Sequence, residues 1–152
     1  MKKNLFVITC LLLVCMGIAY SADAIEATIV SPLNGTMIPK IIDVEITAKD
    51  IPTGQDLWIG VYPLDVKRYY IQDKRHSPFV RTIRGNLSTE AQVGIDFDSG
   101  LKFRLLIIAA NRTAIVSIMD YLDKSNKIGS WPGLVTLPDG AVIYDTKIVT
   151  RE

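Results

Sequence analysis

Residues 41–49 read Ile-Ile-Asp-Val-Glu-Ile-Thr-Ala-Lys, so that apolar and polar side chains alternate one by one. Successive side chains of a β-strand point to opposite faces, which would gather the apolar ones on a single face. The residues on that face would be Ile42, Val44, Ile46 and Ala48. This period of two predicts a strand with one face buried and the other in water.

Further stretches with strand character lie on both sides of this one and are separated by turn sequences such as Asn34-Gly35 and Asp139-Gly140. The predicted strands cover residues 26–31, 41–49, 57–62, 67–72, 79–84, 91–95, 101–110 and 141–149. Two of them, 57–62 and 101–110, are apolar on both faces, which predicts central strands that are covered on both sides.

One stretch has the period of a helix instead. Its apolar residues, Ile115, Ile118, Met119 and Leu122, follow i, i+3, i+4, i+7 spacing. Asn111 or Thr113 can cap its start. We expect the apolar face of this helix to cover one end of the strand assembly, and residues 125–137 to be irregular.

These elements predict a mainly β fold. Short strands at nearly regular spacing favour an immunoglobulin-like antiparallel β-sandwich of seven or eight strands, with one helix inserted before the last strand. Trp58, in a predicted central strand, is the candidate for the buried tryptophan of such a sandwich. A barrel with a similar number of strands is the alternative.

The N-terminus has the order of a secretory signal peptide. Lys2 and Lys3 precede an apolar run from Leu5 to Ala19, and the small residues Ala22 and Ala24 follow at cleavage-site spacing. We predict cleavage after Ala24, which divides the chain into a signal peptide, 1–24, and one domain, 25–152. The alternative is an uncleaved membrane anchor, because the apolar run is only slightly shorter than a transmembrane span.

This division decides the chemistry of the mature chain. Of the 17 basic and 16 acidic residues, two lysines and one aspartate lie in segment 1–24, which leaves 15 of each sign. A neutral domain argues against nucleic acid as a partner. Both cysteines, Cys10 and Cys15, also lie in that segment, so the mature domain has no thiol for catalysis, for a disulfide or for a zinc site.

Three of the five asparagines begin Asn-x-Ser/Thr sequons, namely Asn34, Asn86 and Asn111. Two interpretations stay open. The sequons are glycosylation sites of an exported protein, or they reflect the frequency of asparagine, glycine and threonine in turns.

Several segments together resemble a recurring extracytoplasmic module of bacterial and archaeal envelope proteins. They are Leu57–Pro63, Arg68–Gln72, Val93-Gly94, Ser99-Gly100 with Phe103, and Trp131–Leu134 with Leu137-Pro138. The resemblance spans nearly the whole mature chain, although Ile71 stands where the pattern has proline. It implies an immunoglobulin-like or fibronectin-type sandwich outside the cytoplasm, and it assigns no catalytic residue.

The candidate ligand-binding residues are aromatic and basic. Trp131, with Tyr69 or Tyr70, is the candidate platform for a sugar ring, because sugars stack on exposed flat side chains. Lys74 and Arg75 belong to a basic segment, residues 67–84, that suits an acidic glycan, a cell-wall polymer or anionic lipid headgroups. The alternative for the charges is protection of edge strands against aggregation.

Catalytic and metal sites are weakly supported. His76 is the only histidine and lies in a polar loop, so it has no partner that the spacing identifies. Asp96 and Asp98 begin like a calcium loop, but Ile107 stands where the bidentate glutamate would be, which favours a plain turn.

We therefore expect no enzyme, metal or cofactor, and instead a secreted or cell-surface binding or structural module of the cell envelope. Its partner would be an envelope protein or a glycan, and carbohydrate binding is the alternative function. A membrane is a partner only if the N-terminal segment stays uncleaved.

Overall fold

The computed structural model describes residues 26–73 and 84–152, which form a mainly β structure with one helix before the last strand, as predicted. The elements in chain order are β1 (Glu26–Ser31), β2 (Met37–Ile38), β3 (Ile41–Lys49), β4 (Asp56–Pro63), β5 (Tyr70–Ile71), β6 (Arg84–Gln92), β7 (Lys102–Ala110), α1 (Arg112–Ile128) and β8 (Ala141–Arg151).

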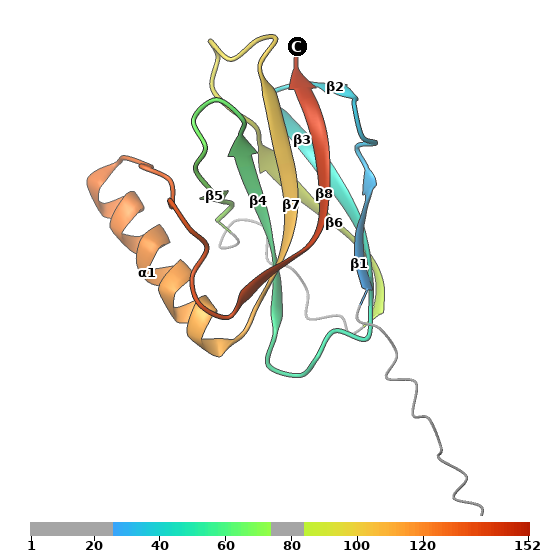
Figure 1. Cartoon of the computed structure of the whole chain (residues 1–152), viewed down its shortest axis with the longest axis vertical. Helices are drawn as coiled ribbons and strands as arrows, with labels where there is room; N and C mark the ends of the chain where they lie inside the picture. Colours follow the sequence, from blue (N-terminus) through green and yellow to red (C-terminus); the bar gives the residue numbers. More distant parts are fainter. Residues whose placement is uncertain (1–25, 74–83) are drawn as a thin grey trace, which may run out of the picture.

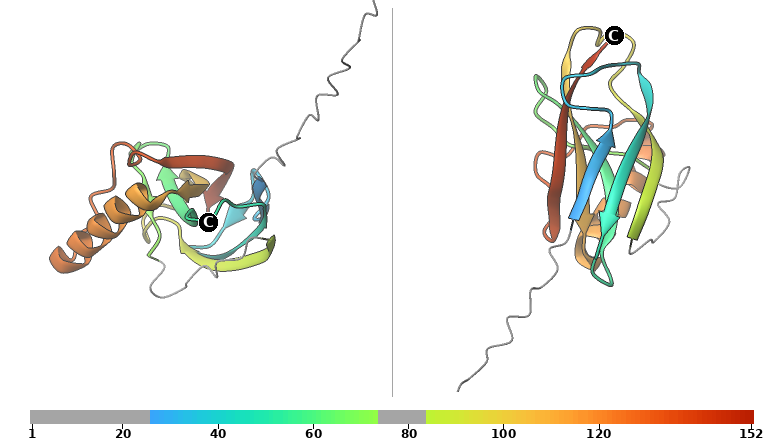
Figure 2. Two further views of the ribbon diagram at one scale, coloured as in Figure 1. Left: turned by 90° about the horizontal axis from the view of Figure 1, so that it is seen from below. Right: turned by 90° about the vertical axis from the view of Figure 1, so that its right-hand side faces the viewer.

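The strands form two sheets that face each other (Figures 1 and 2). One has three strands in the order β1-β3-β6, and the other has five in the order β2-β8-β7-β4-β5. Within the described residues all strand pairs are antiparallel except β2 with β8, which is parallel. Hydrogen bonds from Gly35 to Ile148, from Thr150 to Thr36 and from Glu152 to Ile38 hold that parallel pair.

Strand β3 has one buried face and one exposed face, as its alternating sequence predicts. Its even-numbered apolar side chains are buried and its odd-numbered side chains are exposed. They pack against the inner faces of β4 and β7, and we call the resulting cluster between the two sheets the sandwich core. It is centred on Val44, Ile46, Ile59, Val61, Phe103, Leu105 and Val149.

Helix α1 covers the outer face of the five-stranded sheet rather than one end of the sandwich (Figure 2). Asn111 caps its start by accepting a hydrogen bond from the Ala114 N–H at 3.0 Å, and Gly129 ends it with φ of 65°. The helix therefore continues to Ile128 and includes the first four residues of the segment 125–137, which was expected to be irregular. Its apolar face and the sheet form a second cluster, the helix-side core.

Trp58 is buried, as predicted, but it belongs to the helix-side core and not to the interior between the sheets. The reason is the alternation of β4. Leu57 and Ile59 point into the sandwich core, so that Trp58 must point outward, toward α1. When both faces of a strand are apolar, its sequence does not show which side chains face the other sheet and which face the helix.

The less apolar strands differ from the prediction. The strand expected at 67–72 is reduced to the two residues of β5, and β2 was not predicted. The strand expected at 91–95 is the end of a longer strand, β6, which stops at Gln92. The strand expected at 79–84 lies outside the described residues except for Arg84, where β6 begins. Strand β6 ends before Gly94, whose φ of 75° starts a turn.

A polar side chain joins the two sheets along each open side of the sandwich. On one side Asp145 of β8 accepts a hydrogen bond from the Ile29 N–H of β1 at 2.8 Å. On the other side Gln72, directly after β5, accepts one through Oε1 from the Gln92 N–H of β6 at 2.9 Å. Each of these bonds links one sheet to the other, and the second lies in the candidate site.

No helix within residues 26–73 and 84–152 is long and apolar enough to span a bilayer. The predicted signal peptide and both cysteines lie outside the described residues. Export, cleavage and the division into segments 1–24 and 25–152 therefore stay predictions.

Candidate functional site

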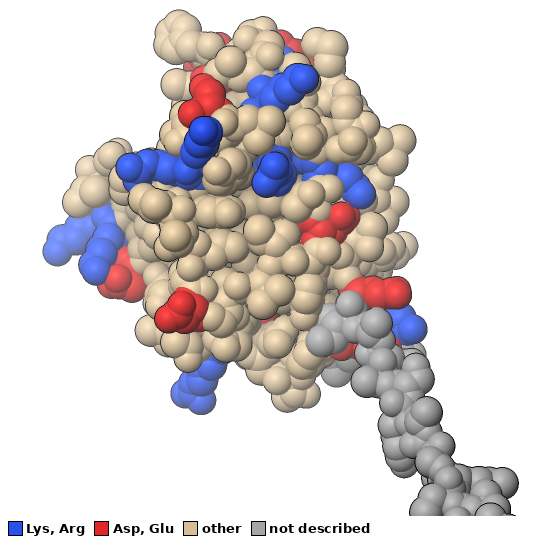
Figure 3. All heavy atoms as spheres, viewed as in Figure 1, with Lys and Arg blue, Asp and Glu red and all other residues tan. Residues whose placement is uncertain are grey.

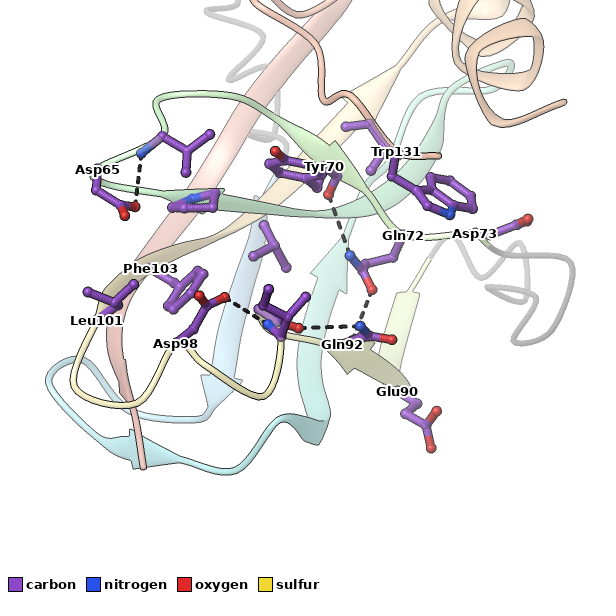
Figure 4. Close-up of a pocket in the computed structure, with 16 residues that line it drawn as sticks. Asp65, Tyr70, Gln72, Asp73, Glu90, Gln92, Asp98, Leu101, Phe103 and Trp131 are labelled. Atoms are coloured by element: carbon purple, nitrogen blue, oxygen red, sulfur yellow. Dashed lines mark hydrogen bonds between the residues drawn. The ribbon is translucent and has the colours of Figure 1, made fainter. Parts of the chain in front are cut away.

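A groove of about 790 Å³ opens where the edge strands of the two sheets, β5 and β6, face each other (Figure 4). The turn between β6 and β7 closes one end, and Trp131 lies at its mouth. Its floor is apolar and is formed by Val61 and Phe103, which belong to the sandwich core. The groove therefore combines an apolar floor with polar side chains on its rim, which is the usual composition of a ligand site.

The loop that carries Trp131 is built onto β5. Tyr69 and Leu134 exchange two backbone hydrogen bonds of 2.8 Å, so that the loop follows the edge of the sheet. Arg68 Nη1 donates to the carbonyl oxygens of Pro132 and Gly133 at 3.4 Å. Together these contacts fix the backbone on both sides of the indole ring.

Gly133 is required at this point of the loop. Its φ is 68°, and a Cβ atom there would approach the Tyr70 ring to 2.9 Å and Arg68 Cβ to 2.8 Å. Only glycine allows this close approach without strain. The Trp-Pro-Gly turn therefore seats against Tyr70 and places Trp131 beside it on the groove wall.

The polar rim is a chain of amide groups (Figure 4). Gln72 Nε2 donates to the Tyr70 carbonyl at 3.5 Å, while Gln72 Oε1 accepts from the Gln92 backbone. Gln92 Nε2 in turn donates to the Gly94 carbonyl at 3.3 Å. The amides are thus held in place by the backbone and present both donors and acceptors at the mouth of the groove.

Two carboxylates of the groove, Asp73 and Asp98, have separate structural partners. Asp73 accepts a hydrogen bond from Asn126 Nδ2 at 3.2 Å, which ties β5 to α1. Asp98 Oδ2 accepts from the Ile95 N–H at 2.7 Å within the turn. Glu90 is exposed on β6. In the described part of the chain no group of three or more histidine, cysteine, aspartate or glutamate residues is placed to hold a metal ion.

Trp131 also contacts the helix-side core through the Tyr121 ring, with 6.3 Å between the ring centres and an edge-on angle of 75°. Burial raises the pKa of the Tyr121 hydroxyl, and the neighbouring Ser125 and Gly133 oppose that shift in part. This tyrosine therefore resists ionisation in the folded protein.

That resistance predicts a loss of stability in alkaline solution. Above pH of about 10 the unfolded chain has lost a proton that folded Tyr121 still holds. The free energy of unfolding then falls as the pH rises toward the folded pKa. Tyr121→Phe should make this fall shallower in urea denaturation at a series of alkaline pH values.

The slope should not vanish in that variant, because burial also raises the pKa of Tyr144. The double variant with Tyr144→Phe should be flatter still. An unchanged slope in Tyr121→Phe would show that its hydroxyl does not titrate differently in the two states.

The structure brings together only some of the predicted ligand residues. Trp131 and Tyr70 line the groove, whereas the Tyr69 ring faces the other side of β5 and packs on Tyr62, with 4.8 Å between the ring centres. Lys74 and Arg75 lie outside the described residues. The groove residues that sequence reasoning missed are Gln72, Asp73, Glu90 and Gln92, since scattered amides and acids have no spacing that identifies them.

Of the catalytic and metal-ligating candidates, His76 lies outside the described residues. Asp96 pairs with Lys40 at 2.7 Å, and this hydrogen bond and charge lower the pKa of its carboxyl. Asp98 accepts its hydrogen bond within the turn, so the two aspartates have different partners.

The three sequon asparagines are exposed. Asn34 Oδ1 accepts a hydrogen bond from the Ile148 N–H at 2.8 Å. Asn86 lies on β6, whereas the Asn111 side chain caps α1 and packs against Gly140. A glycan is therefore sterically easier at the first two positions, and glycosylation stays a prediction.

Comparison with models of known protein families gives no match, and no curated protein matches the sequence significantly.

Proposed function

We propose that this chain is an exported, non-catalytic binding module of the cell envelope, with immunoglobulin-like topology and its ligand site in the groove between β5 and β6. The proposal rests on the Trp131 indole, which is 41% exposed. A hydrogen-bonded loop holds it at the mouth of a groove with an amide rim.

The strand order supports the immunoglobulin-like part of the proposal. If β1, β3 and β6 are named A, B and E, and β4, β7 and β8 are named C, F and G, the two sheets contain A-B-E and G-F-C. Immunoglobulin domains group their strands in the same way. The short strands β2 and β5 extend the second sheet at its ends, and α1 is an insertion between F and G.

The arrangement of the acids supports binding rather than reaction. General acid–base catalysis needs a proton donor or acceptor poised toward the substrate, often oriented by a partner. Asp73 and Asp98 instead accept hydrogen bonds from Asn126 and Ile95, which commits them to holding the fold. Export rests on the signal-like order of residues 1–24.

Carbohydrate is the ligand class that the groove favours. A sugar ring has an apolar face that stacks on an aromatic side chain and a rim of hydroxyl groups that need hydrogen-bond partners. Trp131 and Tyr70 supply aromatic surface, while Gln72, Gln92 and Glu90 supply partners along one side. A protein partner in the envelope is the competing ligand.

Trp131→Ala tests this proposal. The probe is the neutral polysaccharide that, when cast in an affinity gel, retards the native protein most. We expect Trp131→Ala to lose at least tenfold in affinity for it, since hot-spot aromatics contribute about 2 kcal/mol or more. Phe97→Ala is the matched control, because Phe97 is 92% exposed and lies outside the groove. It should leave retention unchanged.

Circular dichroism should show the same fold for both variants. Retention that survives Trp131→Ala, or that falls equally in Phe97→Ala, would contradict the assignment of the groove. Capture from envelope extracts before and after enzymatic glycan removal then separates the two ligand classes, because a protein partner survives the treatment and a glycan does not.

A further inference from the structure

The outer face of the five-stranded sheet carries basic side chains where α1 does not cover it. On β7, Phe103 and Leu105 point into the sandwich core, so Lys102 and Arg104 lie on the opposite, outer face. Farther along the same strand the outer residues, Leu106 and onward, are covered by the helix-side core. The uncovered part of this sheet face is therefore basic.

Figure 3 shows lysine and arginine side chains gathered in a band across this side of the molecule. Lys67, in the loop from β4 to β5, adds an exposed cation at the same end of the sheet, where the Leu64 N–H donates to the Lys102 carbonyl. Among the described residues no carboxylate forms an ion pair with Lys67, Lys102 or Arg104.

Two tyrosines continue this basic surface across the sheet. Arg104 of β7 pairs in register with Tyr62 of β4, and its guanidinium lies 5.7 Å from the centre of that ring. The Tyr62 ring contacts the Tyr69 ring of the neighbouring segment. Arg104, Tyr62 and Tyr69 thus form a row across three adjacent segments, which spans about 10 Å at the usual strand spacing. With Lys102 and Lys67 they make up what we call the basic face.

Protection of a sheet edge does not explain these charges. Lysines on edge strands hinder edge-to-edge pairing, but β7 lies between β4 and β8 and has no free edge. None of the three cations has its charge neutralised by an ion pair with a described carboxylate. They are therefore free to pair with a negatively charged ligand.

We propose that the basic face is a second binding site, distinct from the groove, and that it holds an acidic polysaccharide. Charge complementarity requires a polyanion, since Lys102, Arg104 and Lys67 offer only donors and positive charge. The Tyr62–Tyr69 pair, beside the cations, suits the sugar rings of a uronate chain. Single-stranded nucleic acid also combines anionic groups with flat rings and is the competitor that the test must exclude.

The experiment measures binding of fluorescently labelled polygalacturonate to the protein by anisotropy, with unlabelled dextran as the neutral competitor. We expect the double variant Lys102→Gln/Arg104→Gln to bind at least about tenfold more weakly and to lose most of the salt dependence of the native protein. The double variant Lys124→Gln/Lys127→Gln removes the same charge from the exposed side of α1 and should bind like the native protein.

Two further variants distinguish binding at the basic face from binding in the groove. Trp131→Ala should leave polygalacturonate binding unchanged, so this proposal and the groove can fail independently. Tyr62→Leu should weaken polygalacturonate binding more than binding of polyglutamate, which has the charge but no sugar rings.

Three results would overturn the proposal. They are an equal loss in the two double variants, no binding by the native protein, or tighter binding of oligothymidylate than of polygalacturonate.

Discussion

Trp58→Ala is expected to lower the free energy of unfolding by about 3–5 kcal/mol, because it removes a large side chain that its surroundings cannot replace. Trp58 is only 3% exposed and is packed between β4 and α1. The loss should appear in urea denaturation followed by far-ultraviolet circular dichroism. Hydrogen exchange should speed up in α1 more than in β3, since the helix loses one of its buried contacts with the sheet.

Trp131→Ala provides the matched control, because Trp131 is largely held by its loop and is 41% exposed. Its effect on stability should stay within about 1 kcal/mol, as is usual for surface positions. If Trp58→Ala cost no more than this control, the tight packing of α1 on the outer sheet face would be wrong.

Phe103→Ala is expected to have a comparable effect on the other side of the same sheet, again about 3–5 kcal/mol. Phe103 is 1% exposed, belongs to the sandwich core and also forms part of the groove floor. Its removal should therefore both destabilise the domain and loosen the groove. Thermal denaturation measures the first effect, and polysaccharide retention measures the second.

Phe97→Ala makes the same chemical change at a residue that is 92% exposed. It should alter stability by no more than about 0.5 kcal/mol. A similar melting temperature for the two alanine variants would mean that the Phe103 ring is not enclosed between the sheets.

Local periodicity predicted the strongly patterned elements well. The bounds expected for β1 and β3 agree with the structure, and β4, β7 and the start of α1 agree within a residue or two. These elements bury one face or both, so their apolar side chains record the spacing of the secondary structure itself. The cap residue Asn111 was recognisable because few side chains can serve that position.

The sequence of strand β6 has no such periodic pattern of apolar side chains. Its sequence, Arg-Gly-Asn-Leu-Ser-Thr-Glu-Ala-Gln, has only two apolar side chains other than glycine, Leu87 and Ala91. It is a strand because nine residues of β3 pair with it, and that contact joins distant parts of the chain. Tertiary pairing of this kind overrides a weak local pattern.

The candidate site was predictable in part. Trp131 stood out because it lies in a turn, where an indole has no core to enter. Tyr69 and Tyr70 are consecutive in sequence, so the period of two already implied that only one of them could face the groove. Gln72 and Gln92 form the rim only because the two sheets bring them together, and no sequence spacing encodes that meeting.

The parallel pairing of β2 with β8 gives the domain a mechanical character. When the chain is pulled at β1 and at the C-terminal end of β8, strands β2 and β8 are pulled in opposite directions along their length. The hydrogen bonds between Gly35 and Ile148, Thr36 and Thr150, and Ile38 and Glu152 then bear the load together in shear, instead of opening one after another like a zipper. The domain should therefore resist tension along this line better than tension applied across its sheets.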